Sequence, residues 1–166
     1  SCRGGVLGLS LLRSTKFPDP KADMGRHEFT YSLMPHAGDW RSAGVDVEAE
    51  SLNRPLMVLA GRDPHTSDTW RWAPFTLTGA GALGIEVAAI KPSESGDRVV
   101  VRFVETRGAD SYRLGIDWHM RVGSVESVDV VERPRPSVML SHDRSAQRTE
   151  FTIRPFEIVT LMVERV

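Results

Sequence analysis

The densest set of potentially reactive side chains lies in residues 17–36, FPDPKADMGRHEFTYSLMPH. This stretch contains three carboxylates, an arginine and two histidines: Asp19, Asp23, Arg26, His27, Glu28 and His36. Carboxylates and histidines are common metal ligands, and paired carboxylates perform general acid–base catalysis. Three roles therefore fit the stretch: an active site, a metal site, or a frame that supports a site made elsewhere.

A metal site is not favoured by the spacing of these residues. His27 and Glu28 are adjacent, and adjacent side chains on a strand point to opposite faces, so they do not readily chelate one ion. No HExxH pattern occurs. The other histidines follow no ligand spacing: His36, His65, His119 and His142. We expect no metal or other cofactor within this chain, and we expect its histidines to be surface or hydrogen-bonded residues.

A pair of acids about 5–10 Å apart would suit the hydrolysis of a glycosidic bond. The acids that fit by type are Asp19, Asp23, Glu28 and Glu105. Spacing in a β-rich chain does not fix distances, however, and carboxylates are abundant on protein surfaces. Solvated or structural acids are therefore the favoured interpretation. No nucleophile elbow, cysteine–histidine pattern or Walker loop occurs, and glycine-rich residues 79–84 are predicted to form a turn, because no helix pattern follows them.

Four tryptophans provide a different kind of candidate, a platform on which sugar rings stack. Trp118 lies in a strand pattern, so we predict that it belongs to the core. Trp70 and Trp72 follow a polar loop that begins at Gly61 and are the better candidates for exposure, with Trp40 as the fourth. A carbohydrate-binding role therefore stays open beside the interpretations above.

The elements that must position these side chains are mainly strands, because apolar and polar residues alternate with period two at regular intervals. The predicted strands are residues 6–13, 26–34, 56–60, 75–79, 84–92, 98–106, 112–120, 125–133, 137–141, 150–155 and 157–165. Turn sequences such as SESGD, RGAD and RPRP separate the later ones. This pattern predicts an all-β fold, an antiparallel β-sandwich, and disfavours parallel βαβ units, whose helices are missing.

One segment departs from the strand pattern. Asp39 is a candidate N-cap, and Ala43, Val47 and Leu52 recur at nearly helical spacing. We therefore predict a short helical or irregular crossover near residues 40–52, ended by Pro55, which cannot continue a helix.

Length and composition bound the class of protein. The chain has 166 residues, a net charge of −1 and a single cysteine, Cys2. These values predict one domain, without the basic footprint of a protein that binds nucleic acid or anionic membranes. No apolar run approaches the roughly 20 residues of a membrane span. The lone cysteine favours a reducing, cytoplasmic location, although a single cysteine is also compatible with secretion. The opening SCRGG lacks an initiator methionine, so we expect the chain to be part of a longer protein.

Several longer stretches are similar to one enzyme family. The sequence LGLSLLRSTKFPDPKADMGRHEFTYSLMPHAGDWRSAGV, with LNRPL after it, resembles the C-terminal region of the zinc-dependent α-mannosidases of glycoside hydrolase family 38, in particular their cytosolic and bacterial branch. VVVRFVETRG and RPFEIVTLMV resemble two later strands of that family. The resemblance runs in register over nearly the whole chain, weakens over residues 56–98 and departs at Val104, where the family has an aromatic residue.

The resemblance implies that residues 1–166 are a C-terminal β-sandwich domain of a larger α-mannosidase. In that family the nucleophile, the acid catalyst and the zinc ligands belong to an N-terminal barrel, which a helical domain follows. Neither is present in this sequence, so the chain alone is expected to be inactive, with zinc implied only for the full-length enzyme. Its implied partners are the N-terminal catalytic domain of the same polypeptide and an α-mannoside or oligosaccharide substrate.

The resemblance also gives the opening stretch an expected role. The family's C-terminal region packs against the barrel, and a loop from it can lend polar side chains to the sugar pocket. Our candidates for the rim of that pocket are Asp23, Arg26 and His27, with Asp19 behind them. An interdomain packing loop without sugar contact is the alternative. For the whole chain, an autonomous carbohydrate-binding or interaction module also stays open.

Overall fold

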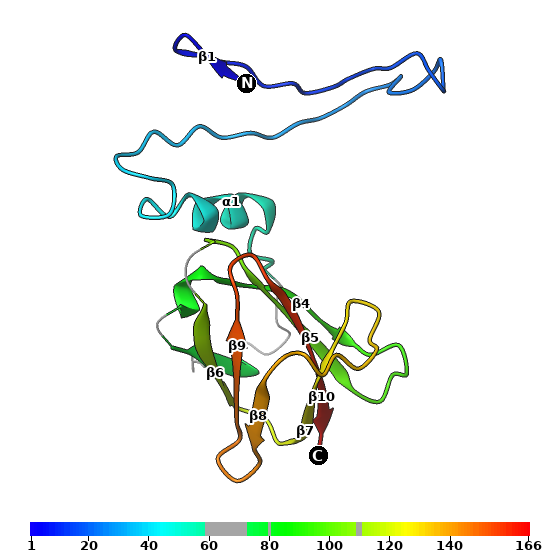
Figure 1. Ribbon diagram of the computed structural model, residues 1–166. Coiled ribbons are helices and arrows are strands. Elements are labelled where there is room, and N and C mark those ends of the chain that lie inside the picture. The colour runs from blue at the N-terminus through cyan, green and yellow to red at the C-terminus, as the bar shows by residue number, and fades with distance from the viewer. Residues whose placement is uncertain (59–72, 80, 109–110) are drawn as a thin grey trace, which may run out of the picture. The chain divides into compact units, whose positions relative to one another are not determined.

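The computed structural model describes residues 1–58, 73–79, 81–108 and 111–166 (Figure 1). The chain divides into two compact units, Ser1–Val45 and Asp46–Val166. No helix in the described residues is long and apolar enough to cross a membrane.

The described part of the second unit contains two four-stranded antiparallel sheets. The first has the order β4 (Ile85–Pro92), β5 (Val99–Glu105), β10 (Ile158–Arg165) and β7 (Val122–Val128). The second has the order β3 (Phe75–Thr78), β6 (Tyr112–Trp118), β9 (Arg148–Ile153) and β8 (Leu140–Asp143). A short 3-10 turn, η1 (Ala82–Gly84), joins β3 to β4. The predicted all-β, antiparallel fold class is confirmed.

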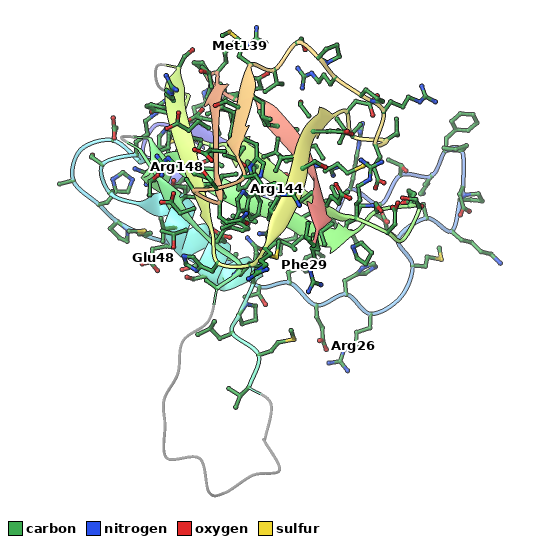
Figure 2. The ribbon with its side chains drawn as sticks, turned by 90° about the horizontal axis from the view of Figure 1, so that it is seen from below. Arg26, Phe29, Glu48, Met139, Arg144 and Arg148 are labelled. Atoms are coloured by element: carbon green, nitrogen blue, oxygen red, sulfur yellow. The ribbon has the colours of Figure 1, made fainter. Side chains whose placement is uncertain are left out.

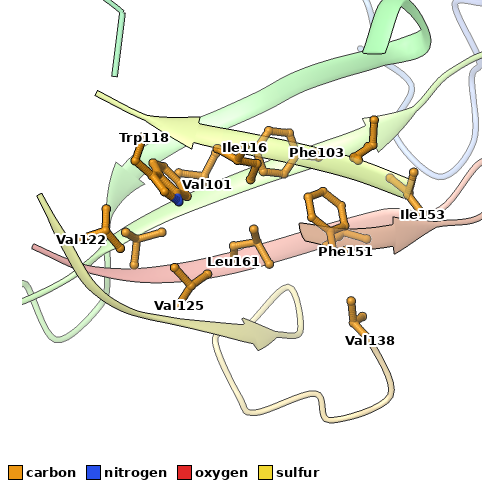
Figure 3. Close-up of a cluster of buried hydrophobic side chains, with 13 residues drawn as sticks. Val101, Phe103, Ile116, Trp118, Val122, Val125, Val138, Phe151, Ile153 and Leu161 are labelled. Carbon is orange, nitrogen blue, oxygen red and sulfur yellow. The ribbon is translucent and has the colours of Figure 1, made fainter. Parts of the chain in front are cut away.

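The core lies between the two sheets, where inward side chains of both meet (Figure 3). Val101 and Phe103 come from the first sheet, Ile116 and Phe151 from the second, and all four are at most 2% exposed. The rings of Phe103 and Phe151 approach to 5.7 Å between centroids. Trp118 is 5% exposed, as its strand pattern predicted. Because alternate residues of a strand face the same way, the period-two pattern of the sequence fills this layer.

The connection from β7 to β8 folds onto the outer face of the first sheet. Pro134 forms an isolated bridge with Val128, and the Arg102 guanidinium donates to the Val130 carbonyl at 3.2 Å. Val100 faces away from the core cluster and is still fully buried. Buried apolar side chains therefore lie on both faces of the first sheet.

Two predicted strands start three residues away from their predicted positions. The strand expected at residues 125–133 is β7, and that expected at residues 137–141 is β8, so the first starts and ends earlier and the second starts and ends later. The cause is a turn at Asp129, whose carboxylate accepts the backbone N–H groups of Val131 and Arg133, both at 2.9 Å. A side chain that binds the backbone locally competes with the strand ladder.

The predicted helical segment is present as α1 (Val45–Asn53). The Asp39 carboxylate accepts the backbone N–H of Ser42 at 2.8 Å, so this residue caps the turn that precedes the helix, not the helix itself. The helix stops two residues before Pro55, where the chain leaves the helical conformation.

Within Ser1–Val45 the described strands are short: β1 (Cys2–Arg3) pairs with β2 (Val6–Leu7). The prediction of a strand over residues 6–13 is wrong beyond Leu7, and that over residues 26–34 is wrong throughout. Strands need a neighbour for their backbone hydrogen bonds, and no described residue pairs with these segments. Of the strand predicted at residues 56–60, the first three are not in a strand, and the last two lie outside the described residues.

Candidate functional site

The loop of residues 19–28 turns sharply at Asp23, which has a φ of 61°, and again at Gly25, with a φ of 130°. The Asp23 carboxylate accepts the backbone N–H of Ser14 at 3.0 Å, and its carbonyl oxygen lies 2.9 Å from Nε2 of His27. Since a carbonyl oxygen only accepts, Nε2 of His27 carries the proton in this contact. Asp23 and His27 are therefore joined by the loop itself.

The other two candidate side chains make separate local contacts. Arg26 forms an exposed ion pair with Glu28, and its side chain extends away from the ribbon in Figure 2. One oxygen of the Asp19 carboxylate accepts the backbone N–H of Lys21 at 2.9 Å. The structure thus connects Asp23 with His27 and does not bring Arg26 or Asp19 into the same contact. An ion pair as exposed as Arg26–Glu28 contributes little to stability.

The chemistry that this loop offers is hydrogen bonding to a polar ligand. All four candidate side chains are exposed, and each has a polar atom outside the contacts named above. The His27 ring stacks on Phe29, with centroids 6.1 Å apart and an interplanar angle of 15°, which restrains the orientation of the imidazole. Sugar sites use polar groups of these types to recognise hydroxyls. A role of these four residues in recognition stays a prediction.

A resident metal does not fit the described residues. Within the described ranges, no three histidine, cysteine, aspartate or glutamate side chains gather in a metal-binding arrangement. His142 instead contacts Thr149 through Nδ1 at 2.9 Å, and His119 contacts Thr76 through Nε2 at 3.1 Å. His65 lies outside the described residues. The family resemblance implies zinc only for the full-length enzyme.

Glu105, one of the four acids that fit a catalytic pair by type, has a structural environment. It is 1% exposed, and its carboxylate accepts three backbone N–H groups: Arg107 at 2.9 Å, Gly108 at 2.8 Å and Phe156 at 2.8 Å. A carboxylate with this many short backbone contacts is held in place and shielded from any ligand. The sequence pattern identified the acid but carried no sign of its donors.

A second acid, Asp46, ties the start of α1 to the loop after β5. The Arg107 guanidinium donates to the two carboxylate oxygens of Asp46, at 2.9 and 3.3 Å, and both side chains are largely buried. These hydrogen bonds hold the pKa of Asp46 below its usual range. At the other end of the helix, Arg54 donates to Glu86 of β4 at 2.6 Å. Neither connection could be predicted from the sequence, because each joins residues more than thirty positions apart.

The described tryptophans do not form a sugar-stacking platform. The Trp118 indole N–H donates to Thr149 at 2.8 Å inside the sandwich. Trp40 is half-buried, and the Arg41 guanidinium lies 4.5 Å from its ring centroid. Trp70 and Trp72, the two better candidates, lie outside the described residues.

Comparison with known proteins identifies the family. Residues 84–161 match the family model described as the glycosyl hydrolases family 38 C-terminal beta sandwich domain. These residues span β4 to the first half of β10, which is the greater part of the sandwich. The chain is also 36% identical over 165 residues to alpha-mannosidase 2C1 of Homo sapiens, a match that covers 98% of this chain. The chain belongs to glycosyl hydrolase family 38.

Two further relatives support the same family. Alpha-mannosidase G of Dictyostelium discoideum is 42% identical over 108 residues, which cover 65% of this chain and 10% of the relative. An alpha-mannosidase of Saccharomyces cerevisiae is 28% identical over an alignment of 178 positions, gaps included, which covers 96% of this chain and 16% of the relative. This family 38 chain spans only 15% of the human relative. The family resemblance drawn from the sequence motifs is confirmed.

Proposed function

We propose that this chain is the C-terminal, non-catalytic part of an α-mannosidase, an enzyme that hydrolyses α-mannosides. The observation that carries the proposal is the 36% identity over 98% of the chain to a protein named alpha-mannosidase. The matching part of that protein is a small fraction of its length, which leaves room for a catalytic domain elsewhere. Expression of a longer protein that contains this sequence, assayed with an aryl α-mannoside, tests the proposal directly.

Catalysis itself is assigned to residues outside this chain. A retaining glycosidase needs two carboxyl groups about 5 Å apart on either side of the sugar. The four acids that fit such a pair by type are occupied otherwise: Glu105 by backbone N–H groups, Glu28 by Arg26, and Asp19 and Asp23 by turns in an exposed loop. We likewise assign zinc, and with it any Lewis-acid chemistry, to the catalytic domain of the longer protein.

Packing against that catalytic domain is part of the proposal. Phe29, Tyr31 and Leu33 are 47%, 64% and 73% exposed, and they alternate along a segment that the sequence pattern marks as a strand. Alternating apolar residues stabilise a strand only when another part of the protein covers the face on which they lie. We propose that residues 26–34 and the alternating residues after Leu7 become strands by pairing with other parts of the longer polypeptide.

Asp23, Arg26 and His27 are proposed to line the rim of the mannose site, with Asp19 behind them. Asp23 and His27 are linked through a turn with two left-handed residues, and a glycine in it permits close approach of a ligand or backbone. A mannose hydroxyl would then accept a hydrogen bond from the guanidinium of Arg26, or donate one to the carboxylate of Asp23 or to Nδ1 of His27.

An autonomous carbohydrate-binding module is the second candidate, and the described residues favour it less. Such a module would expose tryptophans on one sheet, whereas Trp118 is 5% exposed and Trp40 is covered in part by Arg41. A cytoplasmic location is proposed as well, on the single cysteine and on the resemblance to the cytosolic branch of the family.

A further inference from the structure

A hollow of about 320 Å³ lies at the end of the sandwich formed by the β6–β7 and β8–β9 turns. It is lined by Arg121, Val122, Arg144, Ser145, Gln147 and Val166. Figure 1 shows these turns at the end of the sandwich away from α1, and Figure 2, which views the molecule from that side, labels Arg144. Two arginines from separate turns therefore share one concave surface.

The walls of this hollow are fixed by Gln147, which has a φ of 51°. Its amide oxygen accepts the Val122 N–H at 2.6 Å, and its amide nitrogen donates to the Val122 carbonyl at 3.2 Å and to the Arg144 carbonyl at 2.7 Å. One side chain thus connects the residue after Arg121 with the backbone of Arg144. This frame exists without a ligand, so little order has to be created when one binds.

The two guanidinium groups form no ion pair within the described part of the chain. Arg148, which lies outside the lining of the hollow, pairs with both Asp117 and Glu150. The acid next to Arg144 is Asp143, and its Oδ1 oxygen already accepts three hydrogen bonds from Ser145 and Ala146. An anion that enters the hollow is attracted by the positive charge of both arginines.

We propose that this hollow binds a tetrahedral oxyanion, the phosphate group of a small phosphorylated ligand or free phosphate. A guanidinium presents a rigid fork of N–H donors that matches phosphate oxygens two at a time. Two such forks from rigid turns recognise a compact group of high charge better than a singly charged carboxylate. The site is independent of the proposed mannosidase function, because it uses none of the loop residues 19–28.

Titration calorimetry of the 166-residue chain with inorganic phosphate at low salt tests this site. The variants are Arg121→Gln, Arg144→Gln and Arg144→Lys, the last of which keeps the charge and removes the fork. Arg133→Gln is the matched control, because Arg133 is also an exposed arginine in a turn, outside the hollow. Far-ultraviolet circular dichroism of each variant confirms that the fold is retained.

We expect saturable binding by the wild-type chain, weakened about tenfold or more by either glutamine variant and unchanged by the Arg133 control. The lysine variant should bind more weakly than wild type. A hexose 6-phosphate that binds more tightly than inorganic phosphate assigns the site to a phosphorylated sugar, and equal affinity assigns it to free phosphate. Absence of saturable binding, equal loss in all variants including the control, or acetate binding as tightly as phosphate would each overturn the proposal.

Discussion

The carboxylate of Glu105 accepts the backbone N–H of Phe156 at 2.8 Å, although the two residues lie 51 positions apart. The contact joins the VETRG and RPFEI sequences, both of which carry the family resemblance. Phe156 has a φ of 56°, and its ring covers Gly108, where an added Cβ would clash with the ring. One end of the sandwich is thus held together by three residues: the buried Glu105, Gly108, which has no room for a side chain, and Phe156, whose backbone is in the left-handed conformation.

Glu105→Ala should lower the free energy of unfolding strongly. The change leaves up to three backbone N–H groups without their acceptor, and each orphaned buried donor costs about 1–3 kcal/mol. Urea unfolding of the chain measures the loss. Glu105→Gln keeps one acceptor oxygen and should lose less. Glu94→Ala is the control, since that side chain is 85% exposed. A Glu105→Ala variant as stable as this control would show that the N–H groups find other partners.

Thr149→Val should destabilise the sandwich by about 1–3 kcal/mol, because the buried Trp118 indole N–H loses its acceptor. The hydroxyl also contacts His142 at 2.9 Å, so the loss affects two side chains. Thr152→Val, an exposed change on the same strand, is the matched control. Thermal melts of both variants distinguish them, and equal melting temperatures would contradict the assigned role of Thr149.

The Asp46–Arg107 pair should make stability depend on pH in the acid range. Hydrogen bonds from Arg107 lower the pKa of Asp46 below the ordinary value of 3.8, so folding favours the charged form. The pair therefore stabilises the fold at pH values above that ordinary pKa. This contribution disappears as the pH falls through the lower pKa that Asp46 has in the folded state. The difference in melting temperature between wild type and Asp46→Asn should be present at neutral pH and shrink below about pH 4. A difference that stays constant down to pH 2 would contradict this.

The sequence predicted the sandwich well because period two is a local property of each strand. Trp118 could be assigned to the core from its strand pattern without knowing its partners. The contacts of Glu105 and Gln147 could not, because each depends on which distant turns the topology brings together. Residues 26–34 show the converse limit: the alternation of Phe29 and Tyr31 is present, yet a strand forms only where a neighbouring strand is available. For the same reason the sequence named Asp23 and His27 but not the contact between them.

The isolated chain should give a circular dichroism spectrum dominated by strands, contain no stoichiometric zinc and not hydrolyse aryl α-mannosides. The proposal places the nucleophile, the acid and the metal ligands outside these 166 residues. Metal analysis and a mannosidase assay on the purified chain check this. A tightly bound zinc per chain, measurable turnover or a spectrum dominated by helix would each contradict the account.

The most direct test of the proposed role is the kinetics of the full-length enzyme with Asp23, Arg26 or His27 changed to alanine. If these side chains contact mannose, melting temperatures should hold while kcat/KM falls about tenfold or more for each lost hydrogen bond worth ~1.5 kcal/mol. Lys21→Ala, an exposed change in the same loop, should leave both quantities unchanged. Lower melting temperatures with unaltered kcat/KM in all three variants would contradict the account and make the loop a packing element only.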